Sequence, residues 1–339
     1  MKIVFFDSKP YDIEAFKKYD LNNEFTYHDT RLTLDTVELC KGYEAVCVFV
    51  NDDVNREVID KLYEYGIRLI LLRCAGYNNV DVHYCYGKIH VFRVPAYSPY
   101  AVAEHAVSLL LTLVRKTHKA YIRTRNFNFS LDGLVGFDLH DKTVGVIGTG
   151  KIGKIFIRIC EGFGMKVIAY DAYPSEGIEY VSLDELYERS DIISLHCPLT
   201  EETYHMINKQ SMDKMSKQPI IINTSRGGLI DAKDLLEALK ERKLSGACLD
   251  VYEEESDIFF RDYSGEIMDD EVLQGLINLP NVIVTSHQAY LTRDALDNIA
   301  ETTIANYHSF IEKGFGVNEL CYGCGRVEDC MKNRQQKCF

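Results

Sequence analysis

Three polar side chains of different chemistry each follow a short apolar run in the second half of the chain. The order is Arg226 after residues 220–223, Glu255 after residues 246–249, and His287 after residues 282–285. If these runs are parallel strands of one sheet, the side chains that follow them lie at the same carboxyl edge. Residues far apart in the sequence would then share one site.

The three residue types are those that reduction of a 2-keto acid by hydride requires. The planar guanidinium of Arg226 suits a carboxylate, which it binds with two parallel hydrogen bonds. His287 can give a proton to the carbonyl oxygen and take it back near neutral pH. A carboxylate beside the histidine, assigned to Glu255, fixes its orientation and stabilises the imidazolium. On spacing alone, Glu253 and Glu254 are alternatives to Glu255.

A glycine-rich loop supplies the context that turns these residues from ordinary surface groups into candidates. The run 143–147 leads into Gly148-Thr-Gly150-Lys-Ile-Gly153, a helix-like stretch follows at 154–163, and a second strand-like run ends at Asp171. Strand, GxGxxG, helix and a later acidic residue form the dinucleotide-binding fingerprint. Asp171 would accept the ribose hydroxyls and repel a 2′-phosphate, which predicts NAD rather than NADP.

The elements that must position these groups alternate along nearly the whole chain. Short, apolar, β-rich runs are separated by longer helix-like stretches, which predicts parallel sheets buried on both faces. The predicted strands span residues 2–6, 45–50, 68–72, 90–94, 143–147, 166–170, 191–195, 220–223, 246–249 and 282–285.

Two helix-like stretches, 99–120 and 289–312, are interpreted as the crossings between two domains. The nucleotide domain would then span residues 100–290. It would be inserted into a second domain, for the substrate, made of residues 1–99 and 291–339. A chain of 339 residues is also longer than a single ordinary core requires.

Composition excludes several classes of function. The net charge of −13 argues against a surface for nucleic acid or anionic lipid. The N-terminus lacks the pattern of a signal peptide, and no apolar run is long enough to span a membrane, so we expect a cytoplasmic protein. Many of the 11 cysteines lie in apolar runs and are expected to be buried free thiols.

Several motifs together resemble those of the D-isomer-specific 2-hydroxyacid dehydrogenase family, most of all its fermentative, lactate-forming members. The resemblance extends from residue 1 to about residue 320. Its motifs are VFVNDD (48–53), LRCAGYNNVD (72–81), RVPAYSP (93–99), AEHA (103–106), GTGKIG (148–153), SLHCPL (194–199), NTSRG (223–227), DVYE (250–253) and HQA (287–289).

The resemblance implies a Rossmann-type doubly wound sheet inserted into a smaller, flavodoxin-like α/β domain, and reversible NADH-dependent reduction of pyruvate to D-lactate. It implies that Arg226 clamps the substrate carboxylate and that His287 is the acid/base with Glu255 as its partner. The backbone of Ala75 and Gly76 would also bind the carboxylate, and Tyr97 and Tyr290 would line the pocket. The residues implied for NAD are Gly148, Gly150, Lys151, Ile152, Gly153, Asp171, Cys197, Pro198, Thr203, Thr224, Ser225, Arg226 and Asp250, with Thr203 standing where the family often has Asn.

The resemblance also implies a homodimer through the nucleotide domains, with a tetramer as a further possibility, and leaves two alternatives open. Relatives with this fold and triad act as nucleotide-sensing corepressors. Others reduce a bulkier keto acid, hydroxypyruvate or glyoxylate. Pyruvate turnover would exclude the first alternative, and a substrate panel would separate the second.

The C-terminal tail departs from the family pattern. It carries Cys321 and Cys324 at CxxC spacing, followed by Cys330 and Cys338. Four cysteines could bind zinc, but the second pair is widely spaced and no strong histidine companion follows. We therefore expect a thiol-bearing tail and no metal site.

Overall fold

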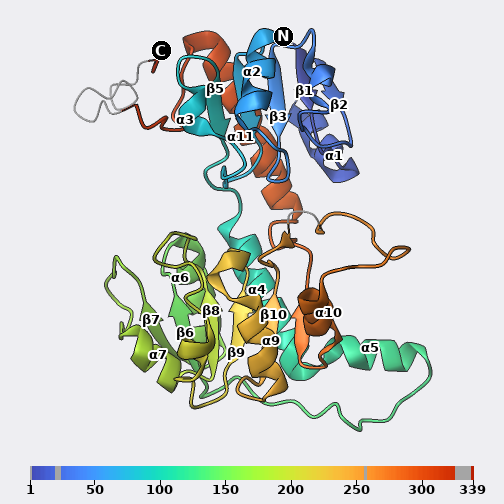
Figure 1. The fold of residues 1–339 in the computed structure, drawn as a ribbon. Helices are drawn as coiled ribbons and strands as arrows, with labels where there is room; N and C mark the ends of the chain where they lie inside the picture. Colours follow the sequence, from blue (N-terminus) through green and yellow to red (C-terminus); the bar gives the residue numbers. More distant parts are fainter. Residues whose placement is uncertain (1, 20–23, 256–257, 325–336) are drawn as a thin grey trace. The chain divides into compact units, whose positions relative to one another are not determined.

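The protein divides into two compact units in a computed structural model that describes residues 2–19, 24–255, 258–324 and 337–339. Unit 1 comprises Met1–Ser98 and Leu291–Phe339, and unit 2 comprises Pro99–Tyr290 (Figure 1). The chain therefore passes from one unit to the other twice, between residues 98 and 99 and between residues 290 and 291.

Unit 1 is a five-stranded parallel sheet in the order β2-β1-β3-β4-β5, the flavodoxin-like order. Its central strands are apolar and fully buried, as expected of a sheet covered on both faces. Its strands are β1 (Lys2–Phe5), β2 (Glu24–Tyr27), β3 (Ala45–Val48), β4 (Leu69–Leu72) and β5 (His90–Arg93), and its helices are α1 (Pro10–Tyr19), the 3₁₀ turn Val37–Cys40, α2 (Arg56–Glu64), α3 (Val82–Cys85) and α11 (Arg293–Lys313).

Unit 2 is a six-stranded parallel sheet in the order β11-β10-β9-β8-β6-β7. Strand order reverses between β6 and β8, which is where doubly wound sheets bind nucleotides. Its strands are β6 (Thr143–Ile147), β7 (Lys166–Tyr170), β8 (Ile192–Leu195), β9 (Ile220–Asn223), β10 (Gly246–Leu249) and β11 (Val282–Val284), and its helices are α4 (Pro99–Arg115), α5 (Thr117–Arg125), α6 (Lys151–Gly162), α7 (Leu183–Arg189), α8 (Lys209–Met212), the 3₁₀ turn Gly227–Leu229, α9 (Ala232–Lys240) and α10 (Glu271–Asn278).

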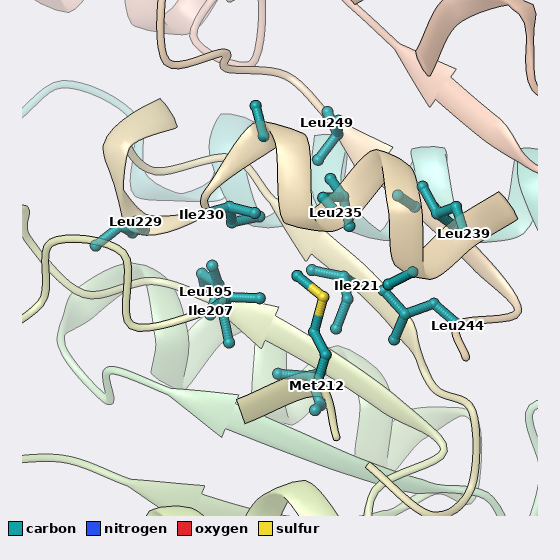
Figure 2. Close-up of a cluster of buried hydrophobic side chains, with 14 of the residues drawn as sticks. Leu195, Ile207, Met212, Ile221, Leu229, Ile230, Leu235, Leu239, Leu244 and Leu249 are labelled. Atoms are coloured by element: carbon teal, nitrogen blue, oxygen red, sulfur yellow. The ribbon is translucent and has the colours of Figure 1, made fainter. Parts of the chain in front are cut away.

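The core of unit 2 fixes the strands whose ends carry the candidate site. Leu235 and Leu239 of helix α9 pack in one buried cluster with Ile221 of β9 (Figure 2). The cluster also contains Leu195 of β8 and Met212 of α8. Packing on this face holds the sheet rigid, so the loops that leave its carboxyl edge start from fixed points.

The fold class predicted from the sequence is confirmed, with local differences. Strand β2 was not predicted because its short run has only Phe25 and Tyr27 as apolar residues, which pack on Phe5 of β1. The predicted helix 99–120 is two helices, α4 and α5, because Lys116 between them has a left-handed backbone with φ +53°. Helix α11 begins at Arg293, capped by the Thr292 side chain, rather than at 289.

Candidate active site

Arg226, Glu255 and His287 follow β9, β10 and β11, which are neighbours in the sheet of unit 2. His287 Nδ1 lies 2.7 Å from Glu255 Oε1, and the other Glu255 oxygen accepts from the backbone N–H of Tyr252 at 2.8 Å. Both side chains are about one-fifth exposed. A carboxylate on Nδ1 leaves Nε2 as the ring nitrogen available to a substrate.

The loop that carries His287 is held by a buried carboxylate. Asp250 has no solvent exposure and accepts from Thr285 Oγ1 at 2.5 Å, Gln288 N at 2.9 Å and Ala289 N at 2.8 Å. His287 itself has φ +51° and donates its N–H to the Asp250 carbonyl at 2.7 Å. A left-handed backbone at a residue other than glycine costs free energy, so these bonds hold the histidine in one orientation.

The three glutamates 253–255 after β10 include two that contact different histidines. Glu253 Oε1 contacts His205 Nε2 at 2.5 Å and accepts from Tyr204 OH at 3.2 Å, whereas Glu255 contacts His287. Glu254 is exposed. Of the three glutamates that the sequence left open, the structure therefore pairs Glu255 with His287.

The glycine-rich loop has the backbone that its residue types predict. Gly148 has φ +96°, and a Cβ there would lie 2.6 Å from Cys197 N. A Cβ on Gly153 would overlap the Gly148 carbonyl oxygen, so a side chain cannot fit between this turn and helix α6. A Cβ on Gly150 would meet nothing within 4 Å. The loop thus has open space at Gly150, with Lys151 and Ile152 opening the helix beside it.

Asp171, directly after β7, lies beside this loop. Its Oδ2 accepts from Thr149 N at 2.5 Å and Thr149 Oγ1 at 3.0 Å, and its Oδ1 accepts from Tyr173 N at 2.8 Å. Burial raises the pKa of this carboxyl, but the hydrogen bonds from Thr149 and Tyr173 outweigh it and lower the pKa overall. Asp171 is therefore a carboxylate, the form that accepts from ribose hydroxyls.

The loops after β8 and β9 leave the same edge of the sheet, and side-chain hydrogen bonds fix them. Ser225 Oγ donates to the Cys197 carbonyl at 2.6 Å, and Thr203 Oγ1 donates to the Pro198 carbonyl at 2.8 Å. Burial raises the pKa of Cys197 to about 11, so this residue is a neutral thiol. Thr224 Oγ1 is buried and has no hydrogen-bond partner within the described part of the chain.

The substrate residues expected in the first half of the chain lie in unit 1. Ala75 and Gly76 follow β4, and Tyr97 follows β5, so both loops leave the carboxyl edge of that sheet. Tyr290 is the last residue of unit 2 and is buried. The structure thus brings together the groups of each unit at that unit's own sheet edge.

Sequence reasoning missed several residues that support the site. His105 on α4 lies 3.1 Å from Thr285 Oγ1 and 3.3 Å from Asp250 Oδ1, although AEHA was among the matching motifs. Asp250 was expected only as a cofactor contact, and its bonds to the His287 loop were not predicted. Spacing in the sequence gives no signal for such contacts, because they join elements that only the tertiary fold brings together.

No helix among the described residues is both long and apolar enough to cross a bilayer. Within the same residues, no group of three or more histidine, cysteine or acidic side chains could hold a metal ion. Cys321 and Cys324 are exposed, while Cys330 of the predicted thiol-bearing tail lies outside the described residues.

The doubly wound sheet of unit 2 carries an open glycine-rich loop beside an ionised Asp171. The buried Thr224 hydroxyl has no partner among the described residues, and His287 is paired with Glu255. Together these features define an NAD-dependent oxidoreductase. The model of the family described as "D-isomer specific 2-hydroxyacid dehydrogenase, NAD binding domain" matches residues 107–289. The chain belongs to this family and is an NAD-dependent 2-hydroxyacid dehydrogenase.

Similar proteins cover nearly the whole chain. It is 48% identical to the D-lactate dehydrogenase of Escherichia coli K12, over 93% of this chain and 98% of that protein. The apo structure of an E. coli D-lactate dehydrogenase superposes with a TM-score of 0.87 at 45% identity, covering 95% of this chain and 100% of the other. The Aquifex aeolicus D-lactate dehydrogenase complexed with NAD and lactic acid has a TM-score of 0.80 at 35% identity, covering 92% and 96%.

Proposed function

We propose that this enzyme reduces pyruvate to D-lactate with NADH, reversibly. The observation that supports this most directly is the His287–Glu255 pair at the sheet edge that also carries Arg226 and the glycine-rich loop. The names of the E. coli and Aquifex relatives support lactate as the substrate, and pyruvate is its 2-keto form.

NAD would lie along the loop from Gly148 to Gly153, with its pyrophosphate at the N-terminus of α6. The adenosine ribose would bind Asp171. Cys197, Pro198, Thr203, Thr224, Ser225 and Asp250 would complete the site. When bound, the nicotinamide supplies or accepts the hydride at C2 of the substrate.

The Arg226 guanidinium would hold the substrate carboxylate, and the backbone N–H groups of Ala75 and Gly76 are further proposed ligands of the carboxylate. Tyr97 and Tyr290 would line the pocket. This anchoring orients the carbonyl for attack, which is the main contribution that binding groups make to rate. His287 would donate its proton to the carbonyl oxygen in reduction and remove it in oxidation, while Glu255 stabilises the charged ring.

The proposed substrate is tested by NADH oxidation with pyruvate, phenylpyruvate, 2-ketoisocaproate, hydroxypyruvate and 2-ketoglutarate. We expect the highest kcat/KM for pyruvate, and a product that is oxidised by a D-specific but not by an L-specific lactate dehydrogenase. A higher kcat/KM for 2-ketoisocaproate than for pyruvate would show that the preferred substrate is a bulkier keto acid. One of the solved structures similar to this chain, a D-2-hydroxyisocaproate dehydrogenase, has a TM-score of 0.83.

We further propose a homodimer formed through the NAD-binding units. Helix α5 and the segment that follows it project from the body of unit 2 (Figure 1). This arm, residues 117–138, exposes many large apolar side chains, among them Phe127 at 84% and Val135 at 82%. An apolar surface of this extent on one segment is typical of a protein interface. The other exposed large apolar residues of this arm are Tyr121, Ile122, Phe129, Leu131 and Phe137.

We also propose that the enzyme works in the cytoplasm. Cys47, Cys160 and Cys248 are buried free thiols, and a reducing compartment would keep them so.

A further inference from the structure

We propose that Arg93 is a positioning residue for the substrate carboxylate, acting through the Ala75–Gly76 peptide. This inference rests on the proposed function, in which that peptide binds the carboxylate. Arg93 ends strand β5, whose neighbour β4 leads into the Ala75–Gly76 loop. Both groups therefore lie at the carboxyl edge of the unit 1 sheet.

The contact is a hydrogen bond from a charged donor to a backbone carbonyl. Arg93 Nη1 donates to the Ala75 carbonyl oxygen at 2.8 Å, and the guanidinium lies over the Tyr77 ring at 5.1 Å. The Arg93 backbone is fixed as well, because its carbonyl accepts from Asn306 Nδ2 at 2.9 Å and its N–H donates to Asn318 O at 3.1 Å.

Planarity of the peptide bond carries the effect of Arg93 to the substrate side. The Ala75 carbonyl and the Gly76 N–H belong to one trans peptide, so they point in opposite directions. Fixing the carbonyl on Arg93 therefore turns the Gly76 N–H away from the arginine. Within the described part of the chain, the N–H groups of Ala75 and Gly76 donate no hydrogen bond to a backbone carbonyl.

The charge of Arg93 adds to the geometry. A cationic donor on the carbonyl polarises the peptide and makes its N–H a stronger donor to an anion. The Gly76 carbonyl is held separately by Cys74 Sγ at 3.2 Å, so the peptides on both sides of Gly76 have restricted orientations. Arg93 thus organises an anion-binding backbone without touching the substrate.

Arg68 offers a matched control in the same sheet. Its Nη1 donates to the carbonyls of Tyr63 and Ile67, and its guanidinium lies 3.9 Å from the Tyr63 ring. Arg68 therefore makes the same two kinds of contact as Arg93. It precedes β4, however, and so lies at the amino edge of the sheet, away from the Ala75–Gly76 loop.

The test compares Arg93→Met, Arg93→Lys and Arg68→Met by steady-state kinetics, by oxamate binding to the enzyme–NADH complex and by thermal unfolding. We expect Arg93→Met to raise the KM for pyruvate and the Kd for oxamate about tenfold or more, the loss expected for a hydrogen bond from a charged donor. The change in kcat should be smaller, and the Kd for NADH should not change, because the glycine-rich loop belongs to unit 2. Arg93→Lys keeps one charged donor and should give intermediate values.

An Arg93→Met enzyme with the parent's KM and oxamate Kd would overturn the inference, as would an equal rise in Arg68→Met. If Arg93→Met does not fold, Arg93→Lys decides: values equal to the parent's contradict the proposal, and a rise in KM with unchanged NADH binding supports it. A parent enzyme that turns over no 2-keto acid would instead overturn the proposed function, and this inference with it.

Discussion

At the scale of single residues, Glu253 and Glu255 contact different histidines, which allows a direct test of the proton-transfer site. His287 would donate a proton in reduction and accept one in oxidation, so both directions should depend on it. Glu255→Gln removes the carboxylate that contacts His287 Nδ1, and kcat should therefore fall in both directions. Replacing His287 by Gln should lower kcat by about 10²–10⁴, the usual range for lost general acid catalysis.

Glu253→Gln is the control for this experiment, because Glu253 contacts His205 instead. The kcat values in both directions should equal those of the parent for Glu253→Gln and be lowered for Glu255→Gln. The reverse pattern would assign the proton-transfer partner to Glu253.

Asp171 gives a second prediction at this scale. Its carboxylate would face the ribose, so the parent should prefer NADH strongly over NADPH. Asp171→Asn removes the charge and keeps one of the two acceptor oxygens, so Thr149 or Tyr173, but not both, retains its partner. We expect the ratio of kcat/KM for the two cofactors to narrow by about tenfold or more, since a like charge no longer opposes a 2′-phosphate. An unchanged ratio would place the ribose elsewhere.

At the scale of elements, two glycines of one loop should respond differently to the same substitution. Gly153→Ala places a methyl group against the Gly148 carbonyl, so helix α6 must move and the melting temperature should fall. Gly150→Ala meets no protein atom within 4 Å and should leave thermal stability close to that of the parent.

Gly150→Ala should nonetheless raise the Kd for NADH, because the methyl group occupies the space proposed for the pyrophosphate. Thermal unfolding and NADH titration of both variants distinguish the two effects. Unchanged NADH affinity in Gly150→Ala would mean that the phosphates do not approach this glycine.

The sequence predicts those features that are encoded by residues close together in the chain. Strands such as β4 and β9 are continuous apolar runs, so burial on both faces identifies them, and GxGxxG specifies its own turn through glycine conformations. The edge strand β2 has little apolar surface and escaped detection. The bonds of Asp250 to Thr285 and of Arg93 to Ala75 join different strand ends, and no local pattern encodes them.

At the scale of the whole molecule, the exposed arm predicts how oligomerisation should respond to mutation. Phe127→Ser together with Phe129→Ser removes two of its most exposed apolar side chains. Because burial of such surface stabilises association, sedimentation velocity should show the dimer dissociating at higher concentrations than for the parent. Val317→Ser, which changes an equally exposed apolar residue of unit 1, should sediment like the parent. A double variant with the parent's dimer affinity would place the interface elsewhere.

The division of unit 1 into two chain segments has a consequence for the order of folding during synthesis. Helix α11 packs against α1, β4 and β5, yet the whole of unit 2 separates it from them in the sequence. A ribosome therefore completes the β1–β5 sheet long before the helix that covers it exists, while unit 2 is contiguous and can fold as it emerges. The fragment 99–290 should accordingly fold when expressed alone, and the fragment 1–98 should expose apolar sheet surface and aggregate or recruit chaperones until residues 291–339 are supplied.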